Sequence, residues 1–273
     1  MFTLIFDTHG GLCNQMYDIY YAINFCMIYD IPFSFRFASL RCNDNLTQWY
    51  NVHFNELFDD TIFKFITLYK PFSSLQIPDE ELFCADSKRC VEWLDRDRAL
   101  YPQLDRLEKP YIVLRQFWSV CPPIVHEKCN IYANIMPCRN LLDLYIENGK
   151  HLPSEYNLIH YRYESDFIEH FKLNTIPLCS IIDNYQFKNN DLPTYIAAYN
   201  IEYLSSKHLS KPLSQFPHCI YKPKHVSDTL NFEEGAFIDF MIGRNAKEVV
   251  GHHNSSFSVL LNNAHITNNY YDV

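Results

Sequence analysis

Hydrophobic residues near the start of the chain follow two different periods. Residues 2–6 are almost continuously apolar, whereas residues 14–29 repeat apolar side chains at helical spacing, with Met16, Ile19 and Ile23 on one face. A second short apolar run follows at residues 33–37. A buried strand, a helix and a second strand in this order predict a β-α-β unit with parallel strands.

The rest of the chain continues this alternation. We predict a strand at 111–115 and a helix near 138–147, followed by strands at 156–163, 193–198, 219–221 and 248–251. Further helices are predicted near residues 177–187, 205–215, 232–242 and 255–263. The polar run at residues 148–153 combines a helix stop with linker chemistry. The pattern predicts an α/β protein with two doubly wound, Rossmann-like lobes facing a cleft, an N-terminal lobe of residues 1–150 and a C-terminal lobe of residues 151–273.

The composition narrows the classes of function. A hydrophobic content of 48% with 16% aromatic residues is typical of a folded globular protein. The net charge of -9 and the lack of a long basic run do not favour nucleic acid as a partner, whereas a nucleotide needs only one or two well-placed cations. No stretch reaches the ~20 apolar residues of a membrane span, and Met1 leads directly into an apolar run without a leader, so a cytoplasmic protein is expected.

The ten cysteines are scattered, with no CxxC and no paired Cys/His spacing. In a cytoplasmic protein they are expected to be buried thiols rather than five disulfides. His252 and His253 are adjacent, so on a helix or a strand their rings would point apart, and we interpret them as non-ligands. No bound metal ion is therefore expected.

Only six glycines occur, and five of them mark two regions. Gly10 and Gly11 follow the first predicted strand, while the other three lie at 235, 243 and 251. Because glycine permits positive φ and a close backbone approach, both regions are candidates for tight turns beside a ligand.

The segment at residues 157–167 brings a charged cluster to the end of an apolar strand, where α/β sheets bind ligands. Alternation places His160, Arg162 and Glu164 on one face and Tyr161 and Tyr163 on the other. The planar guanidinium of Arg162 suits a diphosphate and could neutralise charge on a departing nucleoside diphosphate. Alternatively, Arg162 pairs with Glu164 or Asp166 and only holds the strand end.

A second cluster follows Asp239 and consists of the run Gly251-His252-His253-Asn254-Ser255-Ser256-Phe257-Ser258. Serines at the start of a helix after a strand suit phosphate binding, because hydroxyls and main-chain N–H groups converge with the helix dipole. Ordinary N-capping by Asn254 or Ser255 would explain one such residue but not the whole run.

Three motifs resemble one known family. The run His160-Tyr161-Arg162-Tyr163-Glu164-Ser165-Asp166 is similar to the HLRYE-x-D motif of the plant-type protein O-fucosyltransferases, within the GDP-fucose fucosyltransferase superfamily. Gly10-Gly11-Leu12-Cys13-Asn14-Gln15 resembles the GGL-x-NQ loop of that superfamily, and Asp239 with Ser255-Ser256-Phe257-Ser258 resembles its donor-binding block. The motifs occur in the right order and cover both predicted lobes.

The resemblance implies a GT-B fold and an inverting transfer of fucose from GDP-fucose to a protein or glycan, without a metal. Arg162 would contact the β-phosphate and assist its departure, Ser255, Ser256 and Phe257 would line the GDP site, and Asp239 would contact the guanine or ribose. The residues that it places at the donor are Gly10, Gly11, Asn14, His160, Arg162, Asp239, Ser255, Ser256 and Phe257. Met16, where many relatives have arginine, and the lack of a leader and disulfides leave the acceptor and the compartment open.

Two points remain open after the resemblance. His9, Asp7 and Glu164 are the candidates for a base, and we choose His9 because histidine titrates near neutral pH and this one precedes the glycine loop. A GT-B enzyme using another nucleotide sugar, and a non-catalytic nucleotide- or carbohydrate-binding relative, are the alternative functions.

One short run matches a different class of glycosyltransferase. Asp95-Arg96-Asp97 has the Asp-x-Asp pattern with which GT-A enzymes hold a metal ion and a nucleotide. It lies in a mixed-charge segment with helical spacing, so surface ion pairs are the favoured interpretation.

Overall fold

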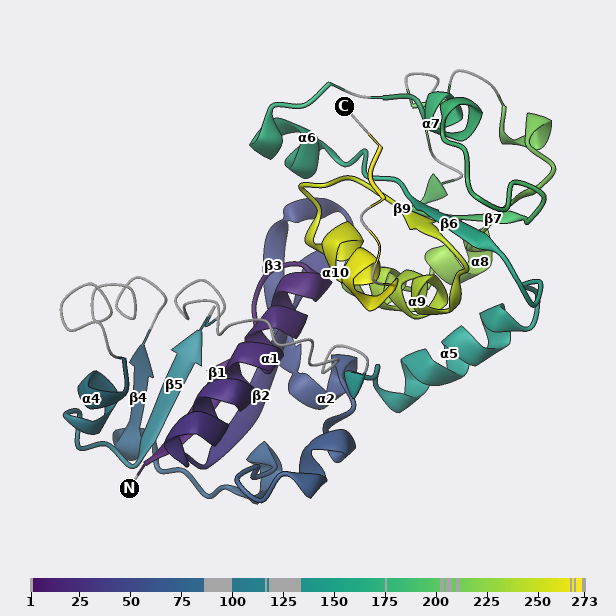
Figure 1. Cartoon of the computed structure of the whole chain (residues 1–273). Helices are drawn as coiled ribbons and strands as arrows, with labels where there is room; N and C mark the ends of the chain where they lie inside the picture. The colour runs from purple at the N-terminus through teal and green to yellow at the C-terminus, as the bar shows by residue number, and fades with distance from the viewer. Residues whose placement is uncertain are drawn as a thin grey trace. The chain divides into compact units, whose positions relative to one another are not determined.

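A computed structural model describes residues 2–85, 100–115, 117, 134–174, 176–201, 204, 208–209, 212–265, 267 and 269–271, and Figure 1 shows the chain as a cartoon. The chain divides into two compact units. The first unit comprises Met1–Leu40 and Trp49–Cys138, and the second comprises Arg41–Gln48 and Arg139–Val273. The lobe bounds 1–150 and 151–273 stay a prediction, and the helix before residue 150 groups with the second unit.

A five-stranded sheet with the order β3-β2-β1-β5-β4 forms the centre of the first unit. Strand β1 (Thr3–Asp7) pairs in parallel with β2 (Phe33–Cys42) on one side and with β5 (Tyr111–Arg115) on the other, and β4 (Leu82–Ala85) pairs in parallel with β5. Helix α1 (Leu12–Tyr29) connects β1 to β2 and packs on β1 (Figure 1). The β-α-β unit predicted from the first apolar runs is therefore present.

The edge strand β3 and several shorter elements complete the first sheet and its surroundings. They are β3 (Asn45–His53), α2 (Phe54–Leu57), η1 (Asp60–Phe65), η2 (Phe72–Ser74), η3 (Asp79–Glu81) and α4 (Leu100–Asp105). Phenylalanines from β1, β2, α2 and η1 pack ring against ring, and the Phe35 and Phe54 rings stack 4.7 Å apart. Such aromatic contacts supply much of the buried apolar surface of this core.

The second unit has a four-stranded parallel sheet with the order β8-β7-β6-β9. Its elements are α5 (Arg139–Gly149), β6 (Asn157–His160), α6 (Ser165–Phe171), α7 (Leu178–Asn184), β7 (Thr194–Ala197), η7 (Leu213–Gln215), β8 (Cys219–Tyr221), α8 (Lys224–Ser227), α9 (Phe232–Asn245), β9 (Val249–Val250) and α10 (Ser256–His265). Helix α9 packs on α5, α10 and β7 (Figure 1). All four residues of β6 are buried, as expected for a central parallel strand.

Local sequence explains where the longest helix of this unit begins. The Asn231 side chain accepts from the Glu234 N–H at 2.9 Å, and the Glu234 carboxylate accepts from the Asn231 N–H at 2.9 Å. This reciprocal capping box satisfies two of the main-chain donors that a helix start leaves unpaired. Helix α9 then places ten buried residues, Asp239 among them, inside the unit.

The predicted elements agree with the structure best where an apolar run has sharp polar borders. Strands β5 and β8 have the predicted bounds, whereas the strand predicted at 156–163 ends at His160 and the one predicted at 33–37 continues to Cys42. The helix predicted at 205–215 falls partly outside the described residues, and those described there include only the 3-10 turn η7. Asp95-Arg96-Asp97 also lies outside the described residues.

No disulfide joins the seven cysteines that the structure describes. Among the described helices, none has the length and the apolar character needed to cross a membrane.

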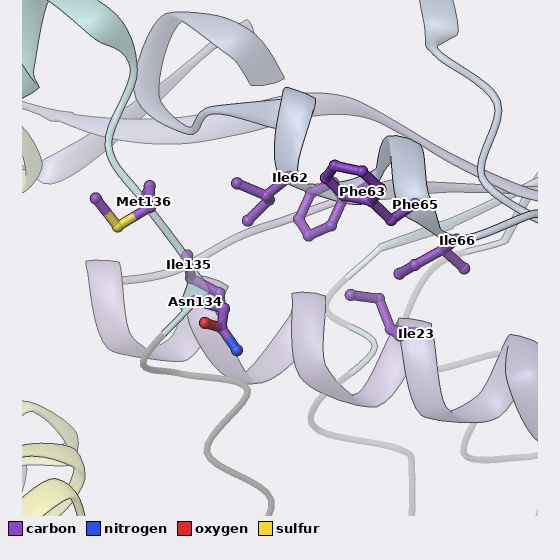
Figure 2. A pocket seen from close by; sticks show the side chains of 8 residues that line it. All are labelled: Ile23, Ile62, Phe63, Phe65, Ile66, Asn134, Ile135 and Met136. Atoms are coloured by element: carbon purple, nitrogen blue, oxygen red, sulfur yellow. The ribbon is translucent and has the colours of Figure 1, made fainter.

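An apolar cavity of about 460 Å³ lies in the first unit between α1 and the segment around η1. Figure 2 shows its lining side chains, with Ile23 of α1 on one side and Ile62, Phe63 and Ile66 on the other. Asn134 is the one polar residue among the described lining residues. Because these residues carry no charge, this cavity is not suited to a phosphate, and the candidate chemistry lies elsewhere.

Candidate functional site

The glycine loop after β1 is held in place by one buried amide. Gly10 has a φ of 92°, a left-handed conformation that favours glycine. The Gln15 amide donates to the Gly10 carbonyl at 2.9 Å and to the Ser39 carbonyl at 2.6 Å. Its oxygen accepts from the Thr8 hydroxyl at 2.8 Å and from the Ser39 N–H at 3.1 Å. Gln15, the last residue of the loop motif, thus ties the loop to β2.

His9 stands at the entrance of this loop and is half-buried. Its Nδ1 lies 2.8 Å from the Ser39 hydroxyl, its main-chain N–H donates to Asp18 at 3.0 Å, and its ring lies 5.2 Å from the Trp49 ring. Burial, with a smaller contribution from the Arg115 charge, lowers the pKa of His9, so its ring is neutral near pH 7. A neutral imidazole can accept a proton.

The other two candidates for a base are already bound to cations. Asp7 accepts from Arg36 at 2.9 and 2.6 Å, and also from Arg115 at 3.2 Å. Glu164 is buried and accepts from Arg162 at 2.7 Å. Both carboxylates thus form ion pairs with arginine, whereas Nδ1 of His9 faces a serine hydroxyl, and His9 as the base stays a prediction.

In the second unit, Arg162 lies just beyond the carboxyl end of β6. Its Nε donates to Glu164, and its guanidinium lies 4.4 Å from the centre of the Phe167 ring. The ion pair considered as an alternative is therefore formed, with Glu164. Burial opposes the charge of the guanidinium, but Glu164 and Asp166 raise the pKa of Arg162, so it stays charged. Among the described residues, no acceptor lies within hydrogen-bond distance of its two Nη groups.

A second arginine of this unit compensates the acidic residues near Arg162. Arg41 donates through Nη1 to Asp166 at 2.9 Å and through Nε to Glu233 at 2.7 Å, and its guanidinium lies 3.6 Å from the Phe232 ring centre. Because Arg41 neutralises Asp166 and Glu233, Glu164 is left as the carboxylate that holds Arg162 directly. Glu164 therefore orients the Arg162 guanidinium through Nε and leaves its outer edge, which carries the two Nη groups, open.

His160, which is buried next to Arg162, packs against the first turn of α10. Its Nδ1 lies 2.7 Å from the Ser258 hydroxyl, and its ring stacks on Phe257 with centroids 4.1 Å apart. Burial, with Arg162 and His252 contributing further, holds the pKa of His160 well below its ordinary value. His160 is therefore neutral, and it joins the end of β6 to the start of α10.

The C-terminal segment also fastens the end of β6, which the sequence did not indicate. The Tyr271 hydroxyl donates to the His160 carbonyl at 3.2 Å and lies 3.5 Å from the Arg162 N–H. The Tyr271 N–H donates to the Gly251 carbonyl at 3.0 Å. One buried tyrosine thus holds the main chain on both sides of Tyr161.

The turn between β9 and α10 carries two buried polar atoms, Nε2 of His252 and Oγ of Ser255, that have no hydrogen-bond partner among the described residues. Nδ1 of His252 accepts from the Asn254 N–H at 3.1 Å, which places the ring proton on Nε2. Among the described residues, the main-chain N–H groups of Ser256 and Phe257 also find no acceptor. Unpaired donors at a helix start form a site for an anion.

The arrangement of the two adjacent histidines corrects the prediction that their rings point apart. The His252 and His253 rings stack with centroids 4.7 Å apart, because the two residues lie in a turn and not on a helix or a strand. His252 is therefore a residue of the site that the sequence argument missed, since only the fold shows that its ring is buried. In the part of the chain that is described, no three His, Cys, Asp or Glu side chains gather to hold a metal ion.

Asp239 has partners for both carboxylate oxygens. It accepts from the Lys222 ammonium at 2.7 Å and from the Tyr195 hydroxyl at 2.7 Å. Burial raises the pKa of Asp239, and Lys222 and Tyr195 oppose this rise. The role of Asp239 at the guanine or ribose stays a prediction, and the ion pair with Lys222 gives the residue a structural role as well.

The buried His252 ring is expected to make the stability of the protein depend on pH. Burial, with His253 and Arg162 adding to it, lowers the pKa of His252 to about 4. An unfolded histidine takes up a proton near pH 6.5, so the unfolded state binds more protons between about pH 6.5 and 4. The free energy of unfolding should therefore fall as the pH is lowered through this window, as measured by urea denaturation.

The variant His252→Gln should show a shallower decline over the same window. His253→Gln, at the exposed neighbouring position, should keep most of the decline, because burial is the main cause of the low His252 pKa and His253 only adds to it. An identical slope in all three proteins would contradict a neutral, buried His252.

Comparison with known proteins places the fold. No protein-family model and no curated protein matches the sequence. The solved structure of POFUT1 in complex with GDP matches with a TM-score of 0.69 at 10% identity, over 100% of this chain and 99% of that chain. POFUT1 in complex with GDP-fucose matches with a TM-score of 0.67 at 11% identity, over 100% and 99%. The fucosyltransferase NodZ from Bradyrhizobium matches with a TM-score of 0.54 at 13% identity, over 96% and 92%. The chain therefore has the GT-B fold that POFUT1 and NodZ share.

Proposed function

We propose that this protein is an inverting, metal-independent glycosyltransferase that transfers fucose from GDP-fucose to a hydroxyl group of a protein or glycan. The observation that carries the proposal is the pair of features at the carboxyl ends of the adjacent strands β6 and β9. One is the charged Arg162, whose guanidinium is held through Nε, and the other is the turn in which the buried Ser255 hydroxyl finds no partner among the residues that the structure describes. Ligands of parallel α/β sheets bind at this edge.

A diphosphate has the chemistry that this edge can satisfy. The outer edge of the Arg162 guanidinium can donate two parallel hydrogen bonds to phosphate oxygens. The Ser255 hydroxyl and the N–H groups at the start of α10 can supply further donors, and the helix dipole favours negative charge there. The GDP and GDP-fucose complexes of POFUT1, a protein of the same fold, support a guanine nucleotide as the ligand.

The proposed reaction breaks one bond and forms one at the anomeric carbon of the sugar. The acceptor hydroxyl gives its proton to a base, its oxygen forms the new bond to carbon, and the bond to the β-phosphate oxygen breaks with its electron pair remaining on GDP. Arg162 stabilises the negative charge that develops on the leaving GDP. His9, neutral and with its ring near the glycine loop, is the residue proposed to accept the proton.

The test of the donor site is the affinity for nucleotides with and without a chelator. GDP should bind with the same Kd in the presence and absence of EDTA, because Arg162 and the start of α10 provide the positive potential that a metal would otherwise supply. GDP should also bind more tightly than UDP. Isothermal titration calorimetry measures all of these affinities directly.

Asp239→Asn tests recognition of the guanine base more sharply than Asp239→Ala. Asparagine has nearly the same shape as the buried Asp239 side chain, so the substitution leaves no cavity in the second unit. A loss of GDP affinity with unchanged thermal stability would assign Asp239 to the nucleotide. A large loss of affinity on chelation would instead favour a metal-dependent site, and tighter binding of UDP would favour a different nucleotide sugar. GDP binding without transfer or hydrolysis of GDP-fucose would favour the non-catalytic alternative.

A further inference from the structure

The environment of His9 leads to a second residue with a role in the reaction, on the basis of the function proposed above. We infer that Ser39 is a positioning residue that holds His9 in the tautomer with the proton on Nδ1, so that Nε2 can accept a proton from the acceptor hydroxyl. Ser39 lies on β2 and is itself buried.

The protons around the Ser39 hydroxyl decide the tautomer of His9. Three groups surround its oxygen: Nδ1 of His9 at 2.8 Å, the Thr8 carbonyl at 3.2 Å and the Asn51 amide oxygen at 3.2 Å. The Thr8 carbonyl can only accept, and the hydroxyl has only one proton to donate. If that proton points to Thr8 or Asn51, Nδ1 of His9 must be the donor to the hydroxyl oxygen.

The opposite arrangement is less favourable. If Ser39 donated to His9, its oxygen would face the Thr8 carbonyl without a proton between them. An oxygen pair of this kind in a buried place costs free energy, because the Thr8 carbonyl then receives no proton from Ser39 and the two oxygens repel each other. The Nδ1–H tautomer satisfies Ser39, Thr8 and His9 together.

The neighbouring contacts keep this geometry rigid. The Gln15 amide fixes Ser39 through its main-chain N–H and carbonyl, and Asp18 fixes the His9 main chain. The charged groups that act on His9 are therefore Asp18, which accepts its N–H, and Arg115, whose charge disfavours a protonated ring. Among the described residues, no hydrogen-bond partner is found for Nε2 of His9. This nitrogen is left to interact with a substrate.

The chemical consequence is that a single ring nitrogen of His9, Nε2, can act as the base. A histidine can accept a proton only through the ring nitrogen that carries none, so a wrong tautomer removes the base even when the ring is in place. A group that bonds to the far nitrogen of a catalytic histidine and sets its tautomer is a recurrent part of acid–base sites. Here a neutral serine performs this task.

The experiment measures the tautomer by long-range ¹H–¹⁵N correlation NMR on the full chain, with the His9 signals assigned by their loss in His9→Gln. The unchanged protein should show the Nδ1–H form of His9. Ser39→Ala should shift His9 toward the Nε2–H form, which histidine prefers in water. Ser39→Thr, which keeps the hydroxyl, should retain the Nδ1–H form.

Ser34→Ala is a matched control, because Ser34 is a buried serine of the same strand whose hydroxyl has no partner among the described residues. It should change neither the tautomer nor the activity. Ser39→Ala should lower the kcat for transfer by about 10-fold to 10²-fold, less than the ~10²–10⁴-fold loss expected when the base itself is removed in His9→Gln. The Kd for GDP should stay unchanged.

The outcomes separate this inference from the proposed function. The Nε2–H form in the unchanged protein, or an unchanged tautomer and kcat in Ser39→Ala, would overturn the role of Ser39. Failure to bind GDP or to use GDP-fucose would overturn the proposed function, while the NMR result would still decide the pairing of Ser39 with His9. The tautomer of the unchanged protein decides that pairing even if Ser39→Ala does not fold.

Discussion

Arg162→Ala is expected to lower the turnover of GDP-fucose by about 10²–10³-fold while weakening GDP binding much less. The reason is that negative charge on the leaving diphosphate increases in the transition state, so the contact with Arg162 is strongest there. Arg162→Lys should recover little, because an ammonium restores the charge but not the two parallel hydrogen bonds. Steady-state kinetics with GDP calorimetry measures both effects.

Removing Arg162 also leaves the buried Glu164 carboxylate without its partner, which costs stability by itself. The comparison therefore needs Arg162→Ala combined with Glu164→Gln, which removes the uncompensated charge and should restore the thermal melt but not the turnover. Arg139→Ala, which removes an exposed arginine paired with Asp143, serves as the control for loss of a positive charge. A folded Arg162→Ala protein that works as fast as the unchanged one would show that Arg162 only holds the strand end.

Gly251→Ala is expected to destabilise the second unit by about 1–3 kcal/mol, the usual range for an overpacked core. A Cβ at Gly251 would lie 2.2 Å from the Ser258 hydroxyl oxygen and 2.7 Å from the Ser258 Cβ. The clash cannot relax easily, because the Ser258 hydroxyl is fixed by His160 and by the His252 N–H. Urea denaturation and GDP affinity should both show the loss.

Gly149→Ala is a matched control, because a Cβ at Gly149 would meet no atom within 4 Å. Gly149 ends α5, so alanine there should leave the stability unchanged or raise it slightly. Adding Ser258→Gly to Gly251→Ala removes the clashing atoms and should recover part of the lost stability. Equal stability of Gly251→Ala and Gly149→Ala would contradict the close approach of Gly251, after β9, to Ser258 in α10.

The sequence predicted those parts of the site that local patterns determine. An apolar run that ends in charged residues indicated a strand with Arg162 at its end, and a serine run before a helical pattern indicated the start of α10. The roles of Arg162, Ser255 and Ser256 at a nucleotide remain predictions, because the comparisons establish the fold alone. The expectation that the His252 and His253 rings point apart assumed a helix or a strand, whereas the two rings stack in a turn, and the interpretation of both residues as non-ligands stays a prediction.

The sequence by itself predicted many of the alternating strands and helices, because burial period and capping residues act over a few neighbouring positions, but it did not indicate strands β3 and β4. It also determined which residue types occupy the ends of β1, β6 and β9. Only the tertiary structure decided which polar groups are paired with each other. Ser39 reaches His9 across 30 positions of sequence and Ser258 reaches His160 across 98, and such contacts depend on strand pairing and helix packing that no local pattern specifies. The same packing left Ser255 and His252 with buried atoms that lack partners among the described residues.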